Sequence, residues 1–293
     1  MLGQELVAVL GNAYSVYGTV RIRDERPNFY ECDITDRNAT IKNIERVNPA
    51  IVIHAAAMTD VEGCEEDRQK AMRVNFEGTK NVVDGARHVR ALMIYISTDF
   101  VFSGTRRESY KESHVPHPAT AYGESKLLGE FYTRDQSSSF LVIRTSWTYG
   151  IHGRNFMTKI LSQAANGQEL YVVEDQRGSP TYVKDLANAM RQMLDVLEES
   201  DAKSALNGIY HVTNSGSASR YQIACELVKQ LKFSNIKINP VSSDEFKTLA
   251  KRSFNSVLDN SRFQNSFGIV MRPWQEALQD YVKELESSKQ LKG

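Results

Sequence analysis

The hydrophobic positions of the chain predict a regular succession of helices and strands. Over residues 2–11, leucine and valine recur three and four residues apart, which is the spacing of an amphipathic helix. Uninterrupted apolar runs farther along are typical of strands that are buried on both faces of a parallel sheet. Such strands are expected at 50–55, 91–96 and 140–144, after a β-rich run at 15–20, and helices are expected at 36–47, 66–89 and 120–134. This alternation predicts an α/β fold with a doubly wound parallel sheet and right-handed crossovers.

The alternation changes after Thr145. The pattern there predicts helices at 155–166, 183–198, 219–232 and 273–287, and strands at 169–173 and 208–213. Because the strand at 208–213 can rejoin the sheet, we expect a larger sheet domain and a smaller α+β lobe. The sheet domain would comprise residues 1–147 and 183–213, and the lobe would comprise residues 148–182 and 214–293.

Charge and cysteine content narrow the classes of function. The 293 residues contain 36 Lys and Arg against 36 Asp and Glu, so the basic excess of a nucleic-acid binder is missing. No apolar run approaches the roughly 18 residues that span a bilayer, so no membrane partner is expected. The three cysteines are far apart and lack metal-ligand spacing. We therefore expect no metal site, no disulfide framework and a cytoplasmic location.

Three residues with complementary chemistry fall where an open α/β sheet binds its ligands, beyond the carboxyl ends of the strands. Thr98 follows the strand at 91–96, and Tyr122 and Lys126 open the next helix, one turn apart on one face. A lysine ammonium about 4 Å from the phenol favours the phenolate by up to about 4 kcal/mol at an effective dielectric of 20. We therefore expect the pKa of Tyr122 to fall by roughly one to three pH units. Such a tyrosine could protonate a carbonyl that accepts hydride. Tyr and Lys four residues apart also occur by chance, and it is their position after a buried strand that favours a function.

Longer segments narrow this chemistry to one family. The Tyr-x-x-x-Lys pair resembles the extended short-chain dehydrogenase/reductase superfamily. The whole chain is similar, in order and spacing, to the dTDP-4-dehydrorhamnose reductase family. The segments that carry this resemblance are YISTDFVFSG (95–104), AYGESKLLGE (121–130), IRTSWTYG (143–150), DQRGSPTYVKDLA (175–187), GIYHVTNSG (208–216) and SVLDNSRF (256–263).

The resemblance implies an NAD(P)H-dependent reduction of the C4 carbonyl of a dTDP-4-keto-6-deoxy sugar. In that case Thr98, Tyr122 and Lys126 are the catalytic residues, and Tyr122 and Lys126 also bind the cofactor. The sheet domain becomes a Rossmann-like dinucleotide-binding domain, and the α+β lobe becomes a substrate-binding lobe.

The resemblance also implies binding residues, and each has a plainer alternative. Ala55, Ala56 and Ala57 would line the cofactor, although small residues also end tightly packed strands. Asp33 and Ile34 would flank the adenine, although this segment could be a simple turn with a helix cap. The residues implied to contact the substrate are Thr59, Val61, Thr98, Trp147 and Asn155, with a core tryptophan as the alternative for Trp147.

Two further arginine positions bear on ligands. Arg21 and Arg23 follow the second strand of the fold, where arginine can meet the 2′-phosphate of NADPH. Asp24 and Glu25 come next and could instead bind the free ribose of NADH, so we favour NADPH and leave NADH possible. Arg252 matches an arginine of the family, but Ser253 stands where the family usually has proline, which leaves the shape of this loop open.

The first residues of the chain are unusual for this fold. A dinucleotide-binding domain begins with a strand and a glycine-rich turn before the helix that faces the pyrophosphate. Gly3 matches the last glycine of that turn, so we expect the first, central strand to be missing from this chain. Two explanations are open: a start codon assigned inside the motif of a longer chain, or a shortened paralogue that has given up cofactor binding. The intact catalytic residues favour the first.

Two other functions are left open by the sequence. One is a non-catalytic regulator resembling the β subunit of methionine adenosyltransferase, which shares this fold and many of these segments. The other is a reductase of a different 4-keto sugar nucleotide. A homodimer is also compatible with the sequence.

Overall fold

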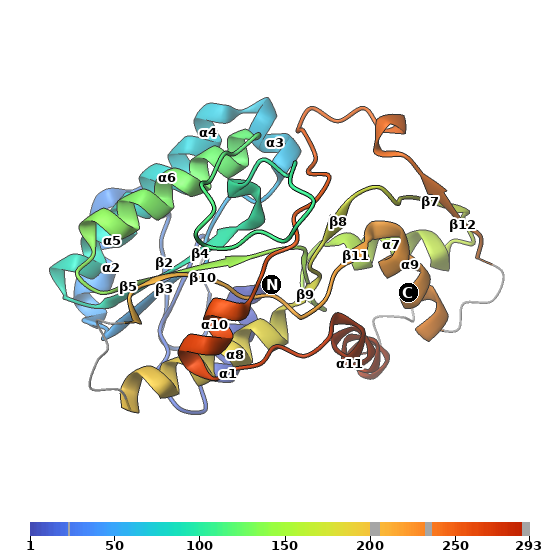
Figure 1. Cartoon of the computed structure of the whole chain (residues 1–293). Helices are drawn as coiled ribbons and strands as arrows, with labels where there is room; N and C mark the ends of the chain where they lie inside the picture. Colours follow the sequence, from blue (N-terminus) through green and yellow to red (C-terminus); the bar gives the residue numbers. More distant parts are fainter. Residues whose placement is uncertain (23, 200–205, 232–235, 289–293) are drawn as a thin grey trace.

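A parallel β-sheet with helices on both faces makes up the larger part of the molecule (Figure 1). The computed structural model describes residues 1–22, 24–199, 206–231 and 236–288. Four strands pair in parallel in the order β10-β5-β4-β3. Their bounds are Ile51–His54 for β3, Leu92–Thr98 for β4, Phe140–Thr145 for β5 and Gly208–His211 for β10. This topology confirms the predicted doubly wound α/β fold, including the return of the strand near 208 to the sheet.

The helices form one layer on each face of this sheet (Figure 1). One layer contains α2 (Arg37–Val47), α5 (Gly78–His88) and α6 (Ala121–Gln136), and the other contains α1 (Leu2–Leu10), α8 (Val183–Glu199) and α10 (Ser261–Phe267). Alternate residues of β4 face the two layers, because successive side chains of a strand point in opposite directions. Met93 and Tyr95 pack with α5, whereas Ile94 packs with α1 and α8.

The sheet is interrupted beyond β3. The strands β1 (Gly18–Val20) and β2 (Phe29–Glu31) pair in parallel with each other, and in the described part of the chain neither pairs with β3. β3 is therefore an edge strand, and its first three residues are only partly buried. The doubly wound order places a strand between these two edges. In the described residues no strand fills this position.

The helix predicted at 66–89 is a broken series that starts earlier, at Val61. It consists of α3 (Val61–Glu66), α4 (Arg68–Met72), the π-helical turn η1 (Arg73–Glu77) and α5. Asp60 and Asp67 cap α3 and α4 by accepting hydrogen bonds from backbone N–H groups in the first turn of each helix. These aspartate caps set boundaries that the apolar spacing did not indicate.

The smaller lobe is built from short strand pairs and helices. It contains the parallel pairs β6 (Thr148–Tyr149) with β9 (Thr181–Tyr182) and β7 (Leu170–Val173) with β12 (Ile238–Val241), the antiparallel pair β8 (Arg177–Gly178) with β11 (Ala218–Ser219), the 3-10 helix η4 (Ser243–Glu245), and the helices α7 (Phe156–Ala165), α9 (Arg220–Gln230) and α11 (Trp274–Ser287). As expected, the apolar stripe of α11, including Trp274, Leu278 and Tyr281, lies in the core of the lobe.

One segment departs from the predicted domain boundaries. Residues 214–293 were assigned to the lobe, but α10 packs on the sheet domain, where Phe263 and Phe267 join the same apolar cluster as Tyr210 of β10. α10 was not predicted from the sequence, because its short length and mixed composition carry little helical pattern. The remaining boundaries stay a prediction.

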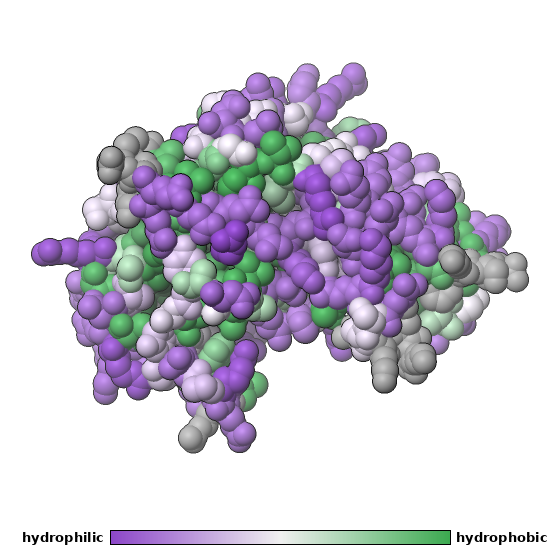
Figure 2. All heavy atoms as spheres, turned by 90° about the horizontal axis from the view of Figure 1, so that it is seen from below, coloured by the Kyte–Doolittle hydropathy of each residue, from purple (hydrophilic) through white to green (hydrophobic). Residues whose placement is uncertain are grey.

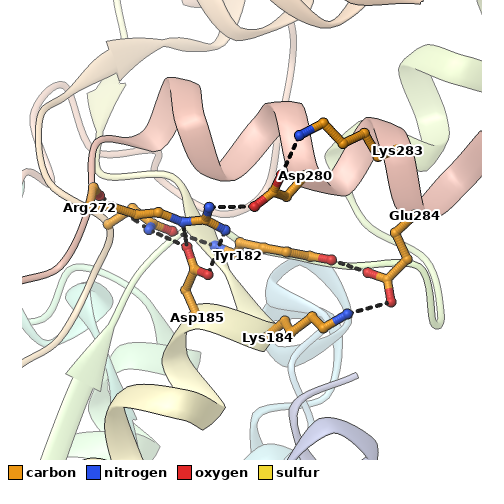
Figure 3. A network of polar contacts seen from close by, with 8 residues as sticks. Tyr182, Lys184, Asp185, Arg272, Asp280, Lys283 and Glu284 are labelled. Atoms are coloured by element: carbon orange, nitrogen blue, oxygen red, sulfur yellow. Dashed lines mark hydrogen bonds and ion pairs between the residues drawn. The ribbon is translucent and has the colours of Figure 1, made fainter.

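A polar network fastens α11 to the start of α8 (Figure 3). The Arg272 guanidinium donates two hydrogen bonds of 2.8 Å to the Asp185 carboxylate and a further one to Asp280. Beside it, the Glu284 carboxylate accepts a hydrogen bond from the Tyr182 hydroxyl. Because a bidentate arginine–carboxylate pair fixes orientation as well as distance, this network holds the helix of the lobe in place against the sheet domain.

Figure 2 shows the molecule from below, and this surface is mainly hydrophilic. Hydrophobic residues gather in patches on the left of the view, over the sheet domain. No helix in the described part of the chain is long and apolar enough to cross a membrane. Within the same residues, no group of His, Cys, Asp and Glu side chains could hold a metal ion. The three cysteines are free.

Candidate active site

The three predicted catalytic residues meet at the carboxyl end of β4. Thr98 is the last residue of that strand, Tyr122 is the second residue of α6, and Lys126 follows one turn later. All three are buried, with exposed fractions of 6%, 8% and 3%. The Thr98 hydroxyl lies close enough to Tyr122 to act on the phenol by hydrogen bonding. The structure therefore brings together the residues that the sequence singled out.

The approach of α6 to β4 depends on Gly123. A Cβ atom at this position would lie 2.1 Å from the carbonyl oxygen of Phe100, in the 3-10 helix η2 (Asp99–Val101) that follows β4. Thr120 caps α6 by accepting a hydrogen bond of 3.1 Å from the Gly123 N–H. The Phe100 ring then packs edge-on against Tyr122, with ring centroids 5.5 Å apart. Only glycine allows the backbone contact that seats Tyr122 beside Thr98.

The expected lowering of the Tyr122 pKa is wrong. Burial raises the pKa of Tyr122 above its ordinary value, and the hydrogen bond with Thr98 opposes this only in part. Burial also lowers the pKa of Lys126 to about 7, against the opposing effect of the Glu130 carboxylate. The Lys126 ammonium lies 4.1 Å from the centroid of the Tyr95 ring and has no hydrogen bond or ion pair with a described residue. Desolvation is the largest cause of both shifts, because burial disfavours the charged form of each group.

Asp99 belongs to the same cluster, although the sequence analysis gave it no role. It is 3% exposed and accepts a hydrogen bond of 3.0 Å from the Thr98 hydroxyl. Burial raises the pKa of Asp99 to about 6, while the Ser256 hydroxyl and the Arg220 guanidinium act in the opposite direction. The proton of the Thr98 hydroxyl thus points to Asp99, and it is available to another acceptor only when this hydrogen bond breaks.

The residues that follow β3, which were predicted to line the cofactor, are largely exposed to solvent. Ala55 and Ala56 follow β3 and are exposed, and Ala57 is partly buried. No bulky neighbour covers the two exposed alanines, as the alternative of tight strand packing would require. This geometry favours the cofactor interpretation, which stays a prediction.

Asn75 is a site residue that sequence reasoning missed. It is fully buried in η1, accepts a hydrogen bond of 2.7 Å from the Met58 N–H and donates one of 3.0 Å to the Met58 carbonyl. It also donates to the Ser125 hydroxyl at 3.0 Å, and Ser125 in turn donates to the Tyr122 carbonyl at 2.8 Å. Asn75 therefore connects the segment that follows β3 to the start of α6. Its place in a π-helical turn, opposite an extended loop, left no signal in the periodicity.

At the predicted adenine end, Asp33 forms a turn. Its carboxylate accepts hydrogen bonds from the N–H and the hydroxyl of Thr35, at 2.9 and 2.8 Å, and these hydrogen bonds lower the pKa of Asp33. The charge of the exposed Arg21 acts on Asp33 in the same direction. Ile34 packs against Gly78, where a Cβ atom would lie 2.7 Å from the Ile34 side chain. The turn interpretation describes this geometry, and contact with adenine stays a prediction.

The residues considered for cofactor choice are not equally available. Arg23 lies outside the described residues. The Asp24 carboxylate is bound by the Arg26 side chain through three hydrogen bonds, which lower the pKa of Asp24 to about 2. Asp24 is thus already paired with a cation, which makes it a poorer partner for a ribose diol. Arg21 is exposed and accessible to a phosphate.

Gly3 occupies the first turn of α1 and is exposed, and a Cβ atom there would meet nothing within 4 Å. The start of this helix lies against the loop at 150–155, because the Met1 side chain is 3.7 Å from the Cβ position of Gly153 and the Met1 sulfur is 3.5 Å from Asn155 Nδ2. A pyrophosphate contact at Gly3 stays a prediction, since no close packing demands glycine here.

Trp147 stands beyond β5, as predicted, but its indole is already packed between two neighbours. It adopts a left-handed conformation, with φ of 45°. A Cβ atom at Gly178 would lie only 2.3 to 2.7 Å from three indole atoms, and the Arg220 guanidinium carbon is 3.7 Å from the ring centroid. A sugar could therefore stack on the indole only if Arg220 moved.

The other predicted substrate contacts differ in how free they are. Asn155 caps α7 and forms a capping box with Thr158, and its amide also donates to the Gly150 carbonyl at 2.9 Å. Its side chain is therefore committed to holding the backbone. Thr59 is exposed and Val61 is partly buried, so both remain accessible to a ligand.

The loop around Arg252 contacts α3 through polar side chains. The Arg252 guanidinium pairs with the Glu62 carboxylate at 2.5 Å, and that carboxylate also accepts a hydrogen bond from the Leu249 N–H. Ser253, at the position where the family usually has proline, packs directly against Gly104, which has φ of 74°. The loop shape that the sequence left open is thus set by contacts with α3 and with the segment after β4.

The doubly wound sheet, with hydroxyl, phenol and amine groups gathered where β4 ends, defines an oxidoreductase of the short-chain dehydrogenase/reductase type. Comparison with known proteins narrows this class. The family model described as RmlD substrate binding domain matches residues 1–287. The chain belongs to this family, that of the dTDP-4-dehydrorhamnose reductases, as the resemblance of its sequence implied.

Relatives of known name support this assignment over most of the chain. The dTDP-4-dehydrorhamnose reductase of Aggregatibacter actinomycetemcomitans is 35% identical over 258 residues, which cover 86% of this chain and 87% of the relative. The spore coat polysaccharide biosynthesis protein SpsK of Bacillus subtilis is 36% identical over 256 residues, covering 87% of each. The crystal structure of a dTDP-4-dehydrorhamnose reductase from Bacillus anthracis in complex with NADP has a TM-score of 0.84 and 32% identity, covering 97% of this chain and 95% of the other.

Proposed function

We propose that this protein uses NADPH to reduce the C4 carbonyl of dTDP-4-dehydrorhamnose, giving dTDP-L-rhamnose. The observation that carries the proposal is the cluster of Thr98, Tyr122 and Lys126 at the end of β4, in a chain whose relatives are named for this reaction. The choice of NADPH rests on the exposed Arg21, on the pairing of Asp24 with Arg26, and on the NADP in the Bacillus anthracis structure. We place the reaction in the cytoplasm because all three cysteines are free.

Two features support a nicotinamide cofactor beside this cluster. Ala55 and Ala56 leave the strand end uncovered, so a flat ring system could approach the backbone there. Lys126 is a buried cation without a hydrogen-bond acceptor among the described residues, and the ribose hydroxyls of a cofactor would supply one. The bound NADPH would provide the hydride.

The protein's own residues would manage the proton. The raised pKa keeps Tyr122 protonated at neutral pH, which is the form that a reduction consumes. As the carbonyl carbon accepts hydride, the O–H bond of Tyr122 breaks and its proton passes to the carbonyl oxygen. A charged Lys126 would stabilise the tyrosinate that remains. The Thr98 hydroxyl, once released from Asp99, would donate a hydrogen bond to the same oxygen.

The substrate would lie between this cluster and the smaller lobe. Thr59 and Val61, at the start of α3, would contact the sugar. Trp147 would border the pocket from the side of the lobe. Asn155 would act by holding the loop at 150–155 in place, because its polar atoms already bind the backbone.

The proposal is tested by NADPH oxidation on addition of dTDP-4-dehydrorhamnose. We expect Tyr122→Phe to lower kcat by orders of magnitude with little change in NADPH affinity. Tyr281→Phe is the matched control, because the Tyr281 hydroxyl is buried without a hydrogen-bond partner among the described residues and lies in the core of the smaller lobe. Near-normal turnover by Tyr122→Phe would remove Tyr122 from the mechanism. Absence of NADPH oxidation by the wild-type chain, together with co-purification of a methionine adenosyltransferase, would favour the regulatory alternative.

A further inference from the structure

Arg220 presents an unpaired cation beside the active site. It is the first residue of α9, and its guanidinium carbon lies 3.7 Å from the centroid of the Trp147 ring and 4.9 Å from that of Phe156. No described residue forms a hydrogen bond or an ion pair with its guanidinium. The residue is partly buried, and its nitrogen atoms are not sealed from solvent.

Two other buried or partly buried arginines are paired with carboxylates. Arg144 is 1% exposed and binds Glu130 with two hydrogen bonds of 2.8 and 2.6 Å, and Arg272 binds Asp185 in the same way. Arg220 has only the more distant charge of Asp99, beyond ion-pair distance. A guanidinium has five N–H donors and no acceptor. No described residue accepts a hydrogen bond from those of Arg220, so they are available to a ligand.

The stacking of Arg220 leaves its donors free for a planar contact. A guanidinium that lies on an aromatic ring uses its face, while its N–H groups point outward in the plane. Burial lowers the pKa of Arg220 to about 10, and Arg252 adds to this lowering, but the group stays charged at neutral pH. Trp147 and Phe156 thus orient a fixed cation whose free edge suits two oxygen atoms of one anion.

We propose that Arg220 binds the diphosphate of the nucleotide-sugar substrate, an inference that rests on the proposed function. If the sugar carbonyl reaches Tyr122, a diphosphate that extends toward the lobe would meet Arg220. On that side Arg220 lies between Asp99, which adjoins the catalytic Thr98, and Phe156 at the start of α7. Arg252 is nearby, but its guanidinium is already paired with Glu62. Arg220 is therefore a specificity residue for the charged link between nucleoside and sugar.

The test compares dTDP with thymidine as ligands of the full chain, by calorimetry in the presence of NADPH. We expect Arg220→Gln to weaken dTDP binding at least tenfold, to leave thymidine and NADPH binding unchanged, and to raise KM for the sugar nucleotide more than it lowers kcat. Arg220→Lys, which keeps the charge but loses the planar edge, should lie between the two. Arg177→Gln is the control, since Arg177 lies on the neighbouring strand β8, is exposed and binds Ser217.

Equal dTDP affinity of the wild-type chain and Arg220→Gln would overturn the proposal. So would an equal loss of dTDP and thymidine binding, because a mere counter-ion for Asp99 has no means of distinguishing the two ligands. Failure of the proposed function has a different signature. In that case the wild-type chain would not oxidise NADPH with the keto sugar, whereas the comparison of dTDP with thymidine could still be read.

Discussion

We expect the buried Lys126 to lower the free energy of unfolding of the protein. The variant Lys126→Met should show the size of this effect. The pKa of Lys126 falls from 10.5 to about 7 on burial. Since a tenfold change in proton binding is worth about 1.4 kcal/mol, holding the charged lysine in the folded protein costs about 5 kcal/mol. Methionine is similar in length, apolar and adaptable, so it can fill the space over Tyr95 without that cost. We therefore expect a variant that is more stable and inactive.

The pH dependence follows from the two pKa values. Below pH 7 the lysine is charged in both the folded and the unfolded chain, so the whole penalty is present. Between pH 7 and 10.5 the folded chain has lost this proton while the unfolded chain keeps it, so the penalty shrinks as pH rises. Lys126→Met should exceed the wild type by about 5 kcal/mol at pH 6 and by only about 2 kcal/mol at pH 9.

Urea unfolding at pH 6 and pH 9, followed by circular dichroism, measures both differences. Lys247→Met is the control, because Lys247 is exposed and its replacement removes a lysine without removing a buried charge. The reasoning is refuted if the advantage of Lys126→Met is the same at both pH values, or if the wild type is the more stable protein at pH 6.

Two further substitutions test the packing that positions the site. Gly123→Ala brings a Cβ atom against the Phe100 carbonyl, so we expect it to destabilise the protein by about 1–3 kcal/mol and to lower kcat. Asn75→Ala leaves the Met58 N–H without its partner, so we expect a loss of about 1–3 kcal/mol and a higher KM for NADPH. Urea unfolding and NADPH oxidation measure both variants, and an Asn75→Ala protein with unchanged KM would show that this link does not reach the cofactor.

The sequence predicted the elements that depend on apolar spacing. The strands β3, β4 and β5 and the helices α1, α2 and α6 lie within a few residues of their expected positions, although β3 is an edge strand and only partly buried. Each of them carries either a continuous apolar run or a helical stripe, and such patterns record which face of an element is buried. Apart from β7, which was expected at 169–173, the short strands of the lobe and α10 were not predicted, because two to seven residues are too few to show a period.

The proximity of Thr98, Tyr122 and Lys126 could also be predicted, because these residues end a strand and begin a helix, and both boundaries are readable from the sequence. Their catalytic roles stay a prediction. What could not be read were contacts between distant segments. Asn75 reaches Met58 and Ser125, and Arg220 reaches Trp147, across tens of residues in the chain. Polar side chains inside helices usually face solvent, so neither residue stood out by type.

The error about the Tyr122 pKa has the same origin, and it bears on how the site works. The Coulomb argument considered two charges one turn apart, but both groups are almost fully enclosed, and burial penalises each charged form. Without ligands, the site therefore favours a neutral tyrosine, a lysine that readily loses its proton, and a Thr98 hydroxyl that is bound to Asp99. A polar ligand that gives Lys126 a hydrogen-bond acceptor would favour its charged form. Loading the site would thus create the charge that stabilises a tyrosinate, which couples proton transfer to the presence of bound ligands.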